Sequence, residues 1–255
     1  MLDALLRIEN VSKNFGGLRA VDNVTLSVRK KSIIGLIGPN GSGKTTLFNL
    51  VSGFYRPDSG TIYFDGSRID GKSLHEVYAK GLVRTFQIPR LFWGLTVLDN
   101  LLLAARGHVG DGLVNTFVKY RDWRQKEVEL AERALKILEI IHLDQARDFP
   151  ASDLSGGQMK LLEVGMVLMS EPKMMLLDEP VAGVNPVLAS AILDRIQAIR
   201  SELGISFFII EHKIEVLVKH AEWIYVMNKG RLVAQGKPDE IVNNKTVIDV
   251  YLGEA

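Results

Sequence analysis

The stretch GPNGSGKTT, residues 38–46, decides the fold because it fits the phosphate-loop pattern G-x-x-x-x-G-K-S/T. Its three glycines allow backbone N–H groups to converge on phosphate oxygens, and a helix that follows adds its positive N-terminal end. Lys44 supplies a point charge to the β- and γ-phosphates, and the hydroxyl of Thr45 can ligate Mg²⁺. The predicted nucleotide-binding loop consists of Gly38, Pro39, Asn40, Gly41, Ser42, Gly43, Lys44, Thr45 and Thr46.

The segments around this loop have the order that the mechanism needs. KKSIIGLIG, residues 30–38, is a short apolar run that predicts a buried parallel strand, and KTTLFNLVSG predicts a helix that stops at Gly53. Further strands are expected at LRIENVS, VTLSV, GTIYFDG, LVRTFQ, KMMLLDEP and ISFFIIEH, and a long helix at PVLASAILDRIQAIRSEL. WIYVMNKGRLVAQG predicts a hairpin that turns at Asn228, Lys229 and Gly230. Strands that alternate with helices indicate an α/β fold with a mostly parallel core sheet, here with an antiparallel β part.

A helical lobe is expected at about residues 90–160, inserted in the nucleotide-binding core. TVLDNLLLAA and EVELAERALKILEII are its clear helices, whereas GHVGDGLVNTFVKY between them is punctuated by glycine and has no assignment. The chain has 255 residues, close to the roughly 250–300 at which single cores stop growing. We therefore interpret residues 1–255 as one domain with two lobes.

Composition excludes several classes of protein. Lys plus Arg number 31 against 30 for Asp plus Glu, so no broad positive charge favours nucleic acid as a partner. Cysteine is absent, which excludes disulfides and thiolate metal sites. The start, MLDALLRIEN, does not have the pattern of a secretory signal, and no stretch approaches the ~18 apolar residues of a spanning helix. A role at a membrane would therefore need a partner.

A pair of acidic residues ends the apolar run MMLL. The strand would deliver Asp178 and Glu179 to its carboxyl end, the edge at which ligands bind in open α/β sheets. Asp178 would hold Mg²⁺, and Glu179 would orient and deprotonate an attacking water. The alternative is an acidic helix cap, which the lysine loop in the same chain disfavours.

LSGGQ, which consists of Leu154, Ser155, Gly156, Gly157 and Gln158, is a second candidate phosphate-binding loop. It offers a hydroxyl, two glycines with exposed N–H groups and a helix expected to begin near Gln158, which together make an anion site. Ser-Gly-Gly is also common in plain turns.

With these motifs in this order, the chain resembles the ATP-binding subunits of ABC transporters over nearly its whole length. The resemblance implies ATP and Mg²⁺ as ligands, Phe15 as the aromatic residue that stacks on adenine, and Gln87 as a contact of Mg²⁺ and the attacking water. It also implies that His212 contacts the γ-phosphate. Taken alone, Phe15 would be a core residue, and Gln87 and His212 would be surface residues at strand ends.

In that family the LSGGQ of one subunit closes over ATP bound to the phosphate loop of another, so two chains hold two nucleotides head to tail. The resemblance thus explains why one chain carries two phosphate-binding loops, and it implies that ATP drives closure of the dimer. Asn185 stands where the family commonly has an aspartate. The neutral amide keeps hydrogen bonds but not the charge, which leaves open its role in communication between the two sites.

VAGVNP, the glycine-rich insertion after Arg106 and the ending IDVYLGEA resemble the importer group for branched-chain amino acids. This implies membrane-spanning permease subunits, a second ATPase subunit in a heterodimer (a homodimer being the other arrangement), an extracytoplasmic solute-binding protein, and a place at the cytoplasmic face of the membrane. Phe92 and Trp93 either line the groove in which the permease docks or pack the two lobes together. Amide or urea importers of the same group remain open. Two alternatives outside the group also remain: the ATPase of a lipopolysaccharide-type exporter, and a non-transport ABC ATPase that acts as a regulatory module. A simple nucleotide kinase would leave LSGGQ and His212 without a purpose.

Overall fold

The computed structural model describes residues 4–85, 91–105, 120–212 and 214–252. The chain divides into two compact units, which we describe separately. The first unit comprises Met1–Gln87 and Lys173–Ala255, and the second comprises Ile88–Pro172.

The first unit is built on a six-stranded sheet in the order β10-β9-β3-β8-β7-β6. Its strands are β3 (Ile33–Ile37), β6 (Leu82–Arg84), β7 (Met174–Asp178), β8 (Ser206–Ile210), β9 (Trp223–Asn228) and β10 (Arg231–Gly236). All neighbouring pairs are parallel except β9 and β10, which form the predicted hairpin. Three of the inner strands, β3, β7 and β8, are buried at every position, as their apolar runs predict.

A four-stranded antiparallel sheet in the order β2-β1-β4-β5 completes the β structure of this unit. It comprises β1 (Ala4–Phe15), β2 (Leu18–Arg29), β4 (Ser59–Phe64) and β5 (Ser67–Arg68). The predicted combination of a mostly parallel core sheet and an antiparallel β part is confirmed.

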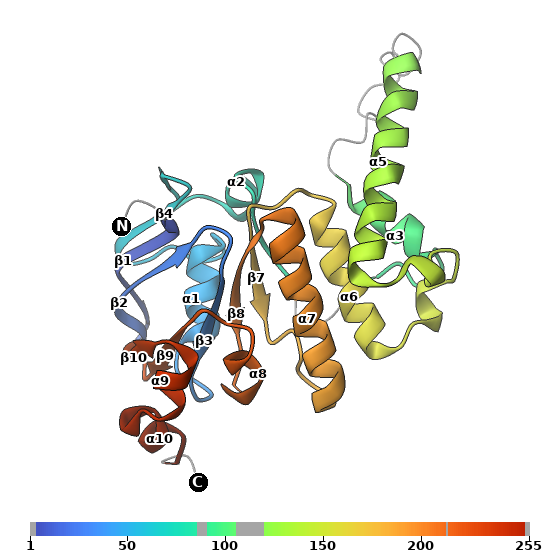
Figure 1. The fold of residues 1–255 in the computed structure, drawn as a ribbon. Coiled ribbons are helices and arrows are strands. Elements are labelled where there is room, and N and C mark those ends of the chain that lie inside the picture. The colour runs from blue at the N-terminus through green and yellow to red at the C-terminus, as the bar shows by residue number, and fades with distance from the viewer. Residues whose placement is uncertain (1–3, 86–90, 106–119, 213, 253–255) are drawn as a thin grey trace. The chain divides into compact units, whose positions relative to one another are not determined.

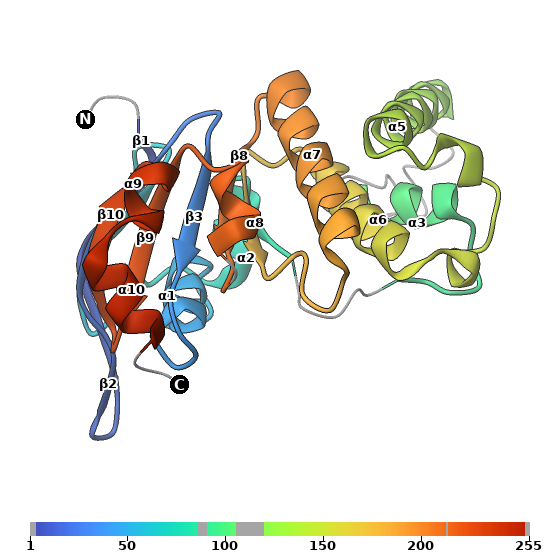
Figure 2. The same cartoon turned by 60° about the horizontal axis from the view of Figure 1, so that its bottom comes forward.

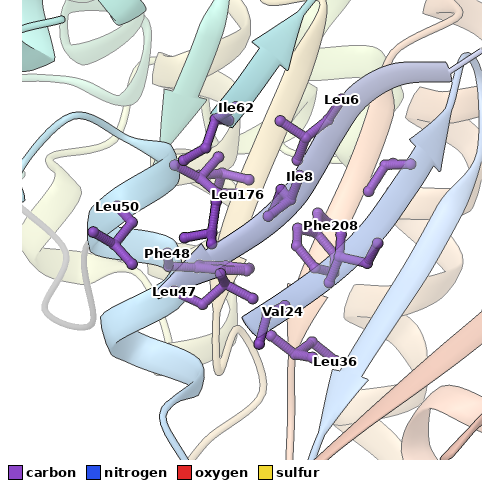
Figure 3. Packing of buried hydrophobic residues seen from close by; sticks show 14 of the residues in the cluster. Leu6, Ile8, Val24, Leu36, Leu47, Phe48, Leu50, Ile62, Leu176 and Phe208 are labelled. Carbon is purple, nitrogen blue, oxygen red and sulfur yellow. The ribbon is translucent and has the colours of Figure 1, made fainter. Parts of the chain in front are cut away.

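The core of the first unit lies where the two sheets meet helix α1 (Lys44–Val51) (Figure 3). Four fully buried side chains point toward one another there: Leu6 and Ile8 from β1, Phe48 from α1 and Phe208 from β8. The rings of Phe48 and Phe208 are 5.0 Å apart between centroids. Helix α1 begins at Lys44, within the phosphate loop, so the packing of this helix also fixes the end of the loop.

The remaining helices of the first unit lie around these sheets (Figure 1). They are α2 (Leu74–Ala79), α7 (Pro186–Leu203), α8 (Ile214–Val218), α9 (Pro238–Val242) and α10 (Lys245–Leu252). Helix α7 has the bounds that the sequence predicts, with Asn185 as its N-cap and Gly204 in the left-handed conformation after its last turn. Helices α9 and α10 follow β10 and lie beside it in both views (Figure 2).

The second unit is helical. It contains α3 (Val97–Ala104), α5 (Tyr120–Ile141) and α6 (Gly156–Leu168), with short 3-10 helices at Asp144–Ala146 and Ala151–Asp153. A Cβ added at Gly165 of α6 would lie 2.8 Å from a side-chain atom of Ile141 and 3.0 Å from one of Leu101, so the glycine lets the three helices approach closely. The unit therefore continues beyond the predicted end near residue 160.

Within the described residues, no helix has both the length and the apolar character that crossing a membrane requires.

Candidate functional site

The phosphate loop leaves the carboxyl end of β3, which lies between β8 and β9 in the central sheet. Gly38 has φ 149°, and a Cβ there would lie 2.1 Å from the carbonyl oxygen of Met227 in β9. Gly43 has φ 100°, and its Cβ would lie 2.3 Å from the carbonyl oxygen of Ala20 in β2. Side chains at these two positions would collide with backbone, so the glycines let the loop pass between β2 and β9.

Lys44 lies inside the turn of this loop and is 6% exposed. Its ammonium group donates hydrogen bonds to the carbonyl oxygens of Gly38 (2.6 Å) and Pro39 (2.8 Å). The first N–H groups of α1 have no partner within the helix. The loop thus presents an ammonium and a helix N-terminus together, which is an anion site.

A cleft of about 590 Å³ lies over this loop, a volume in the range of small-molecule sites. It brings together seven consecutive residues of the predicted loop, Asn40 to Thr46, and the acidic residue Glu179. Its other walls come from Leu18, Arg19 and Ala20 of β2 and from Lys229 and Gly230 of the β9–β10 hairpin. The sequence predicts the hairpin turn but not its position: periodicity does not tell which strands lie beside the phosphate loop. None of these five residues was therefore predicted to belong to the site.

The rim of the cleft is held by an ion-pair network around Asp22. Its carboxylate accepts hydrogen bonds from Arg231 (2.6 Å) and Arg19 (3.0 Å), and its N–H donates to Gly230 (2.8 Å). The bond from Arg231 is the main cause that lowers the pKa of Asp22 below its ordinary value. The network ties β2 to the β9–β10 hairpin, the two elements that form the walls.

Asp178 ends β7 and is 3% exposed. Its Oδ2 accepts a hydrogen bond from the Arg84 guanidinium at 2.6 Å, whereas Oδ1 is buried and has no hydrogen-bond partner among the described residues. The other arm of Arg84 donates to the side-chain oxygen of Asn49 at 2.5 Å. The sequence analysis did not identify Arg84, whose partners are 35 and 94 residues away along the chain.

Glu179 follows Asp178 in the left-handed conformation, with φ 54°. Its N–H donates to the carbonyl of Ile210 (3.0 Å), and its Oε1 lies 3.3 Å from Nδ1 of His212. The structure therefore brings two of the predicted catalytic side chains together from the ends of neighbouring strands. Gln87, the third, lies outside the described residues.

Glu211, between Ile210 and His212, is a further residue that sequence reasoning missed. Its side chain is buried, with the residue 2% exposed, and its Oε1 accepts a hydrogen bond from the N–H of Val181 at 3.3 Å. Its own N–H donates to Leu36 of β3 (3.2 Å). Glu211 thus ties the segment after Glu179 to the ends of β8 and β3. A charged residue in an apolar strand was the available signal.

Asn185 caps α7, since its Oδ1 accepts a hydrogen bond from the N–H of Leu188 at 2.9 Å. The amide oxygen is therefore used within the chain, where an aspartate would cap as well.

Phe15 ends β1 and is 40% exposed. Its ring makes an edge contact with Tyr55, 5.2 Å between centroids, and Tyr55 makes a similar contact with Phe54 at 5.0 Å. Phe15 is not among the residues that line the 590 Å³ cleft. It nevertheless lies three residues before Leu18, which does line it.

The LSGGQ segment, in the second unit, forms the start of α6. The helix begins at Gly156, two residues before the predicted start near Gln158. Ser155 is its N-cap: the N–H of Ser155 donates to Oε1 of Gln158 (2.9 Å), and the Ser155 hydroxyl accepts from the N–H of Gln158 (3.4 Å). Both glycines therefore lie in the first turn, where N–H groups have no partner within the helix.

Phe92 and Trp93 are 53% and 50% exposed. The buried side chain of Asn100 holds this segment through hydrogen bonds with the N–H (2.8 Å) and the carbonyl (3.1 Å) of Phe92. A neighbouring segment carries Phe149, which is 57% exposed. It joins the first through bonds such as that from the N–H of Ala151 to Leu95 (2.9 Å). All three aromatic side chains are thus at least half exposed.

Family models match two parts of the chain. The model described as ABC transporter matches residues 21–182, which include the phosphate loop, the LSGGQ segment, Asp178 and Glu179. A second model, described as branched-chain amino acid ATP-binding cassette transporter, matches residues 231–255.

Curated proteins and solved structures match the whole chain. A probable branched-chain amino acid transport ATP-binding protein, LivG of Archaeoglobus fulgidus, is 47% identical over 98% of this chain and 95% of its own length. The high-affinity branched-chain amino acid transport ATP-binding protein LivG of Escherichia coli is 38% identical, with both chains covered completely. The ADP conformation of an ATP-binding cassette of an ABC transporter superposes with a TM-score of 0.85 at 41% identity, over 98% of this chain and 99% of that one.

Proposed function

Because this chain belongs to the ATP-binding subunits of ABC transporters, we propose that it hydrolyses ATP to power an importer of branched-chain amino acids. ATP hydrolysis is the activity of that family. The observation that carries the proposal is the cleft in which the phosphate loop meets Glu179, in a chain whose full-length relatives are named for branched-chain amino acid transport.

The residues of the cleft and those close to it along the chain have different roles in the reaction. Lys44 and the N–H groups at the start of α1 bind the phosphates, and Lys44 exchanges the carbonyl oxygens of Gly38 and Pro39 for phosphate oxygens. Glu179 accepts the proton of the attacking water, a role that contributes typically ~10²–10⁴-fold to the rate. His212, 3.3 Å from Glu179, orients that carboxylate and contacts the γ-phosphate. Phe15, braced by Tyr55, offers a ring face to adenine; such a stack is worth roughly 1–3 kcal/mol.

The residues present fit a magnesium ion. Asp178 has a buried oxygen, Oδ1, without a hydrogen-bond partner among the described residues, and a buried polar atom of this kind is stabilised by a cation. Thr45 and Asp178 would hold Mg²⁺ together with Gln87, and the remaining ligands would be phosphates and water. When bound, the ion would neutralise the negative charge on the β- and γ-phosphates.

The LSGGQ segment of this chain would act on ATP held by a second chain. Ser155 and the N–H groups of Gly156 and Gly157 form an N-terminal anion site on α6, on a unit that does not include the phosphate loop. The second chain is a related ATPase subunit in a heterodimer or a copy of this chain in a homodimer, and ATP binding favours the closed dimer.

The remaining partners follow from the transport role. Two permease subunits would bind the chain at the cytoplasmic face of the membrane, and the exposed aromatics Phe92 and Trp93 would contact them. An extracytoplasmic solute-binding protein would deliver the amino acid to the permease.

A pull-down of the tagged Glu179→Gln chain from detergent-solubilised native membranes with MgATP tests this proposal. We expect two permease subunits, a second ATPase and a binding protein that is stabilised by leucine, isoleucine or valine but not by aspartate. Trp93→Ala in the same chain should reduce the yield of permease while ATP affinity is kept.

The two alternatives predict other outcomes of the same experiment. An outer-envelope lipid-export assembly would reverse the direction of transport and keep the ATPase mechanism. Ribosomes or DNA in place of membrane subunits would contradict the transport role.

A further inference from the structure

Arg84 is not one of the residues that the proposed ATPase chemistry uses, yet it connects two of them. We propose that Arg84 is a positioning residue for the magnesium site: it holds Asp178 on β7 and helix α1, which carries Thr45, in one fixed arrangement. This inference rests on the proposed function, because it concerns the same metal site.

The contacts of Arg84 connect its own strand, β6, with two other elements of the first unit, β7 and α1. The residue ends β6 and donates one hydrogen bond to Asp178 Oδ2 at 2.6 Å and another to Asn49 Oδ1 at 2.5 Å. Its guanidinium carbon also lies 5.9 Å from the centre of the Phe48 ring, next to Asn49 on α1. A guanidinium is planar and donates from a rigid fork, so bonding at both arms fixes the direction from β7 to α1.

Helix geometry extends this link to the predicted metal ligand on α1. Thr45 and Asn49 are four residues apart, and residues at this spacing lie on the same face of a helix. The face of α1 that Arg84 contacts is therefore the face that carries the Thr45 hydroxyl. Thr45 also lines the nucleotide cleft, so this face reaches from the cleft to the Arg84 contact.

The bond to Arg84 also makes the two oxygens of Asp178 different. Oδ2 is engaged by the guanidinium, and Oδ1 is left as a buried acceptor without a hydrogen-bond partner among the described residues. Asp178 is 2% exposed at its side chain and Arg84 is 19% exposed, so water competes little for this pair. Arg84 thereby balances the charge of the buried carboxylate and fixes its rotamer, with Oδ1 free to face a cation.

The test is the affinity of Mn²⁺, used in place of Mg²⁺, for the full chain saturated with a non-hydrolysable ATP analogue, measured from the EPR signal of free Mn²⁺. Changes around metal ligands typically cost about 10–100-fold in metal affinity. We expect a loss of at least about tenfold in Arg84→Met, whereas the affinity for the nucleotide in EDTA stays within about twofold, because Lys44 and the α1 N-terminus still bind the phosphates. In turnover, kcat should fall more than KM rises.

Two further variants keep the test decisive. Asn49→Leu retains the Arg84–Asp178 pair and removes only the link to α1, so it should lose part of the Mn²⁺ affinity even if Arg84→Met does not fold. Arg68→Met removes an arginine from an ion pair with Asp70 on the rim of the other sheet and should leave Mn²⁺ affinity unchanged.

The outcomes separate this inference from the proposed function. Wild-type affinity for Mn²⁺ in both Arg84→Met and Asn49→Leu overturns the role of Arg84, and so does a loss in Arg68→Met as large as in Arg84→Met. If the wild-type chain itself binds neither the nucleotide nor Mn²⁺, the proposed function fails and the inference fails with it.

Discussion

Gly38 and Gly41 belong to the same phosphate loop but are constrained in different ways. A Cβ at Gly38 would lie 2.1 Å from a carbonyl oxygen of β9, whereas no atom lies within 4 Å of a Cβ at Gly41. Both glycines have positive φ, 149° and 74°. Position 38 therefore requires glycine for two reasons, the positive φ and the lack of room for a Cβ. Position 41 requires it only for the positive φ.

We predict that Gly41→Ala lowers the free energy of unfolding by about 1–2 kcal/mol, the cost of a left-handed conformation in a residue with a Cβ. Gly38→Ala should cost more, because β9 must also move. Urea unfolding of the two variants beside the wild type measures both values. Equal losses would mean that the close approach to Met227 does not constrain the loop.

Among single residues, the sequence predicted those that belong to local motifs. The phosphate loop and the pair Asp178–Glu179 follow from short patterns, and the structure places Lys44, Thr45 and Glu179 at one cleft. Arg84 and Glu211 were missed because their contacts join strands that are far apart in the sequence, and no spacing rule relates such residues.

At the start of α6, the side chain of Ser155 has two functions that a substitution can separate, helix capping and the proposed contact with phosphate. Ser155 caps the helix through the hydrogen bonds that it shares with Gln158, and in the proposed mechanism it also contacts a phosphate. Aspartate caps a helix as well as serine does, but its negative charge would repel a phosphate.

We therefore predict that Ser155→Asp keeps the stability of the chain within about 0.5 kcal/mol but prevents formation of the ATP-dependent dimer. Ser155→Thr, which keeps the hydroxyl and the neutral cap, is the matched control and should form the dimer. Size exclusion with light scattering, in the Glu179→Gln background with MgATP, measures the dimer. A dimer of normal yield in Ser155→Asp would argue against phosphate contact by this segment.

A histidine in the connection from α8 to β9 contacts helix α7. His220 is 6% exposed at its side chain, and its Nδ1 lies 3.4 Å from Gln197 and 3.8 Å from Asp194, both on α7. Burial lowers the pKa of His220 below its ordinary value of 6.5; Asp194 opposes this shift, and Lys219 adds to it. The folded chain thus binds this proton less well than the unfolded chain does.

We predict that the free energy of unfolding falls as pH decreases below 6.5 and through the lower folded pKa of His220, by at most about 1.4 kcal/mol per pH unit. Above 6.5 the residue is neutral in both states and has no effect. Urea unfolding at pH 7 and pH 5 should show a smaller decrease in His220→Gln than in the wild type. His75→Gln, on the exposed side of α2, should behave as the wild type does.

Apolar runs and caps predicted the strands and the long helix α7, since burial at every position and an Asn–Pro start leave few alternatives. The start of α6 was placed two residues late because Gly156 and Gly157 have low helix propensity, and the capping box with Gln158 outweighs it. The short helices α8, α9 and α10 have five to eight residues, too few for periodicity to identify them.

For the whole molecule, the question is whether each site needs two chains. The phosphate loop and the LSGGQ segment belong to different compact units of the chain. If sites are shared between chains, a loop from one chain and an LSGGQ segment from another should make one complete site.

We predict that a mixture of Lys44→Ala and Ser155→Asp chains, each inactive alone, recovers ATPase activity. In the mixed dimer, the intact loop of the Ser155→Asp chain meets the intact LSGGQ segment of the Lys44→Ala chain, so one of two sites works. Activity of the mixture should reach up to about half of the wild-type value per dimer and should increase with protein concentration. A mixture no more active than its components would mean that two copies of this chain do not share their sites.

The contacts of Lys44 with Gly38 and Pro39 have a consequence for which nucleotides the chain accepts. The ammonium group of Lys44 already donates hydrogen bonds to two carbonyl oxygens. A ligand must therefore replace these acceptors when it binds. A ligand with two neighbouring phosphates offers the ammonium group oxygens and negative charge from both, whereas AMP offers those of a single phosphate. The loop would thus discriminate by the length of the phosphate chain before any base is recognised, and it would regain its own internal partners each time a spent nucleotide departs.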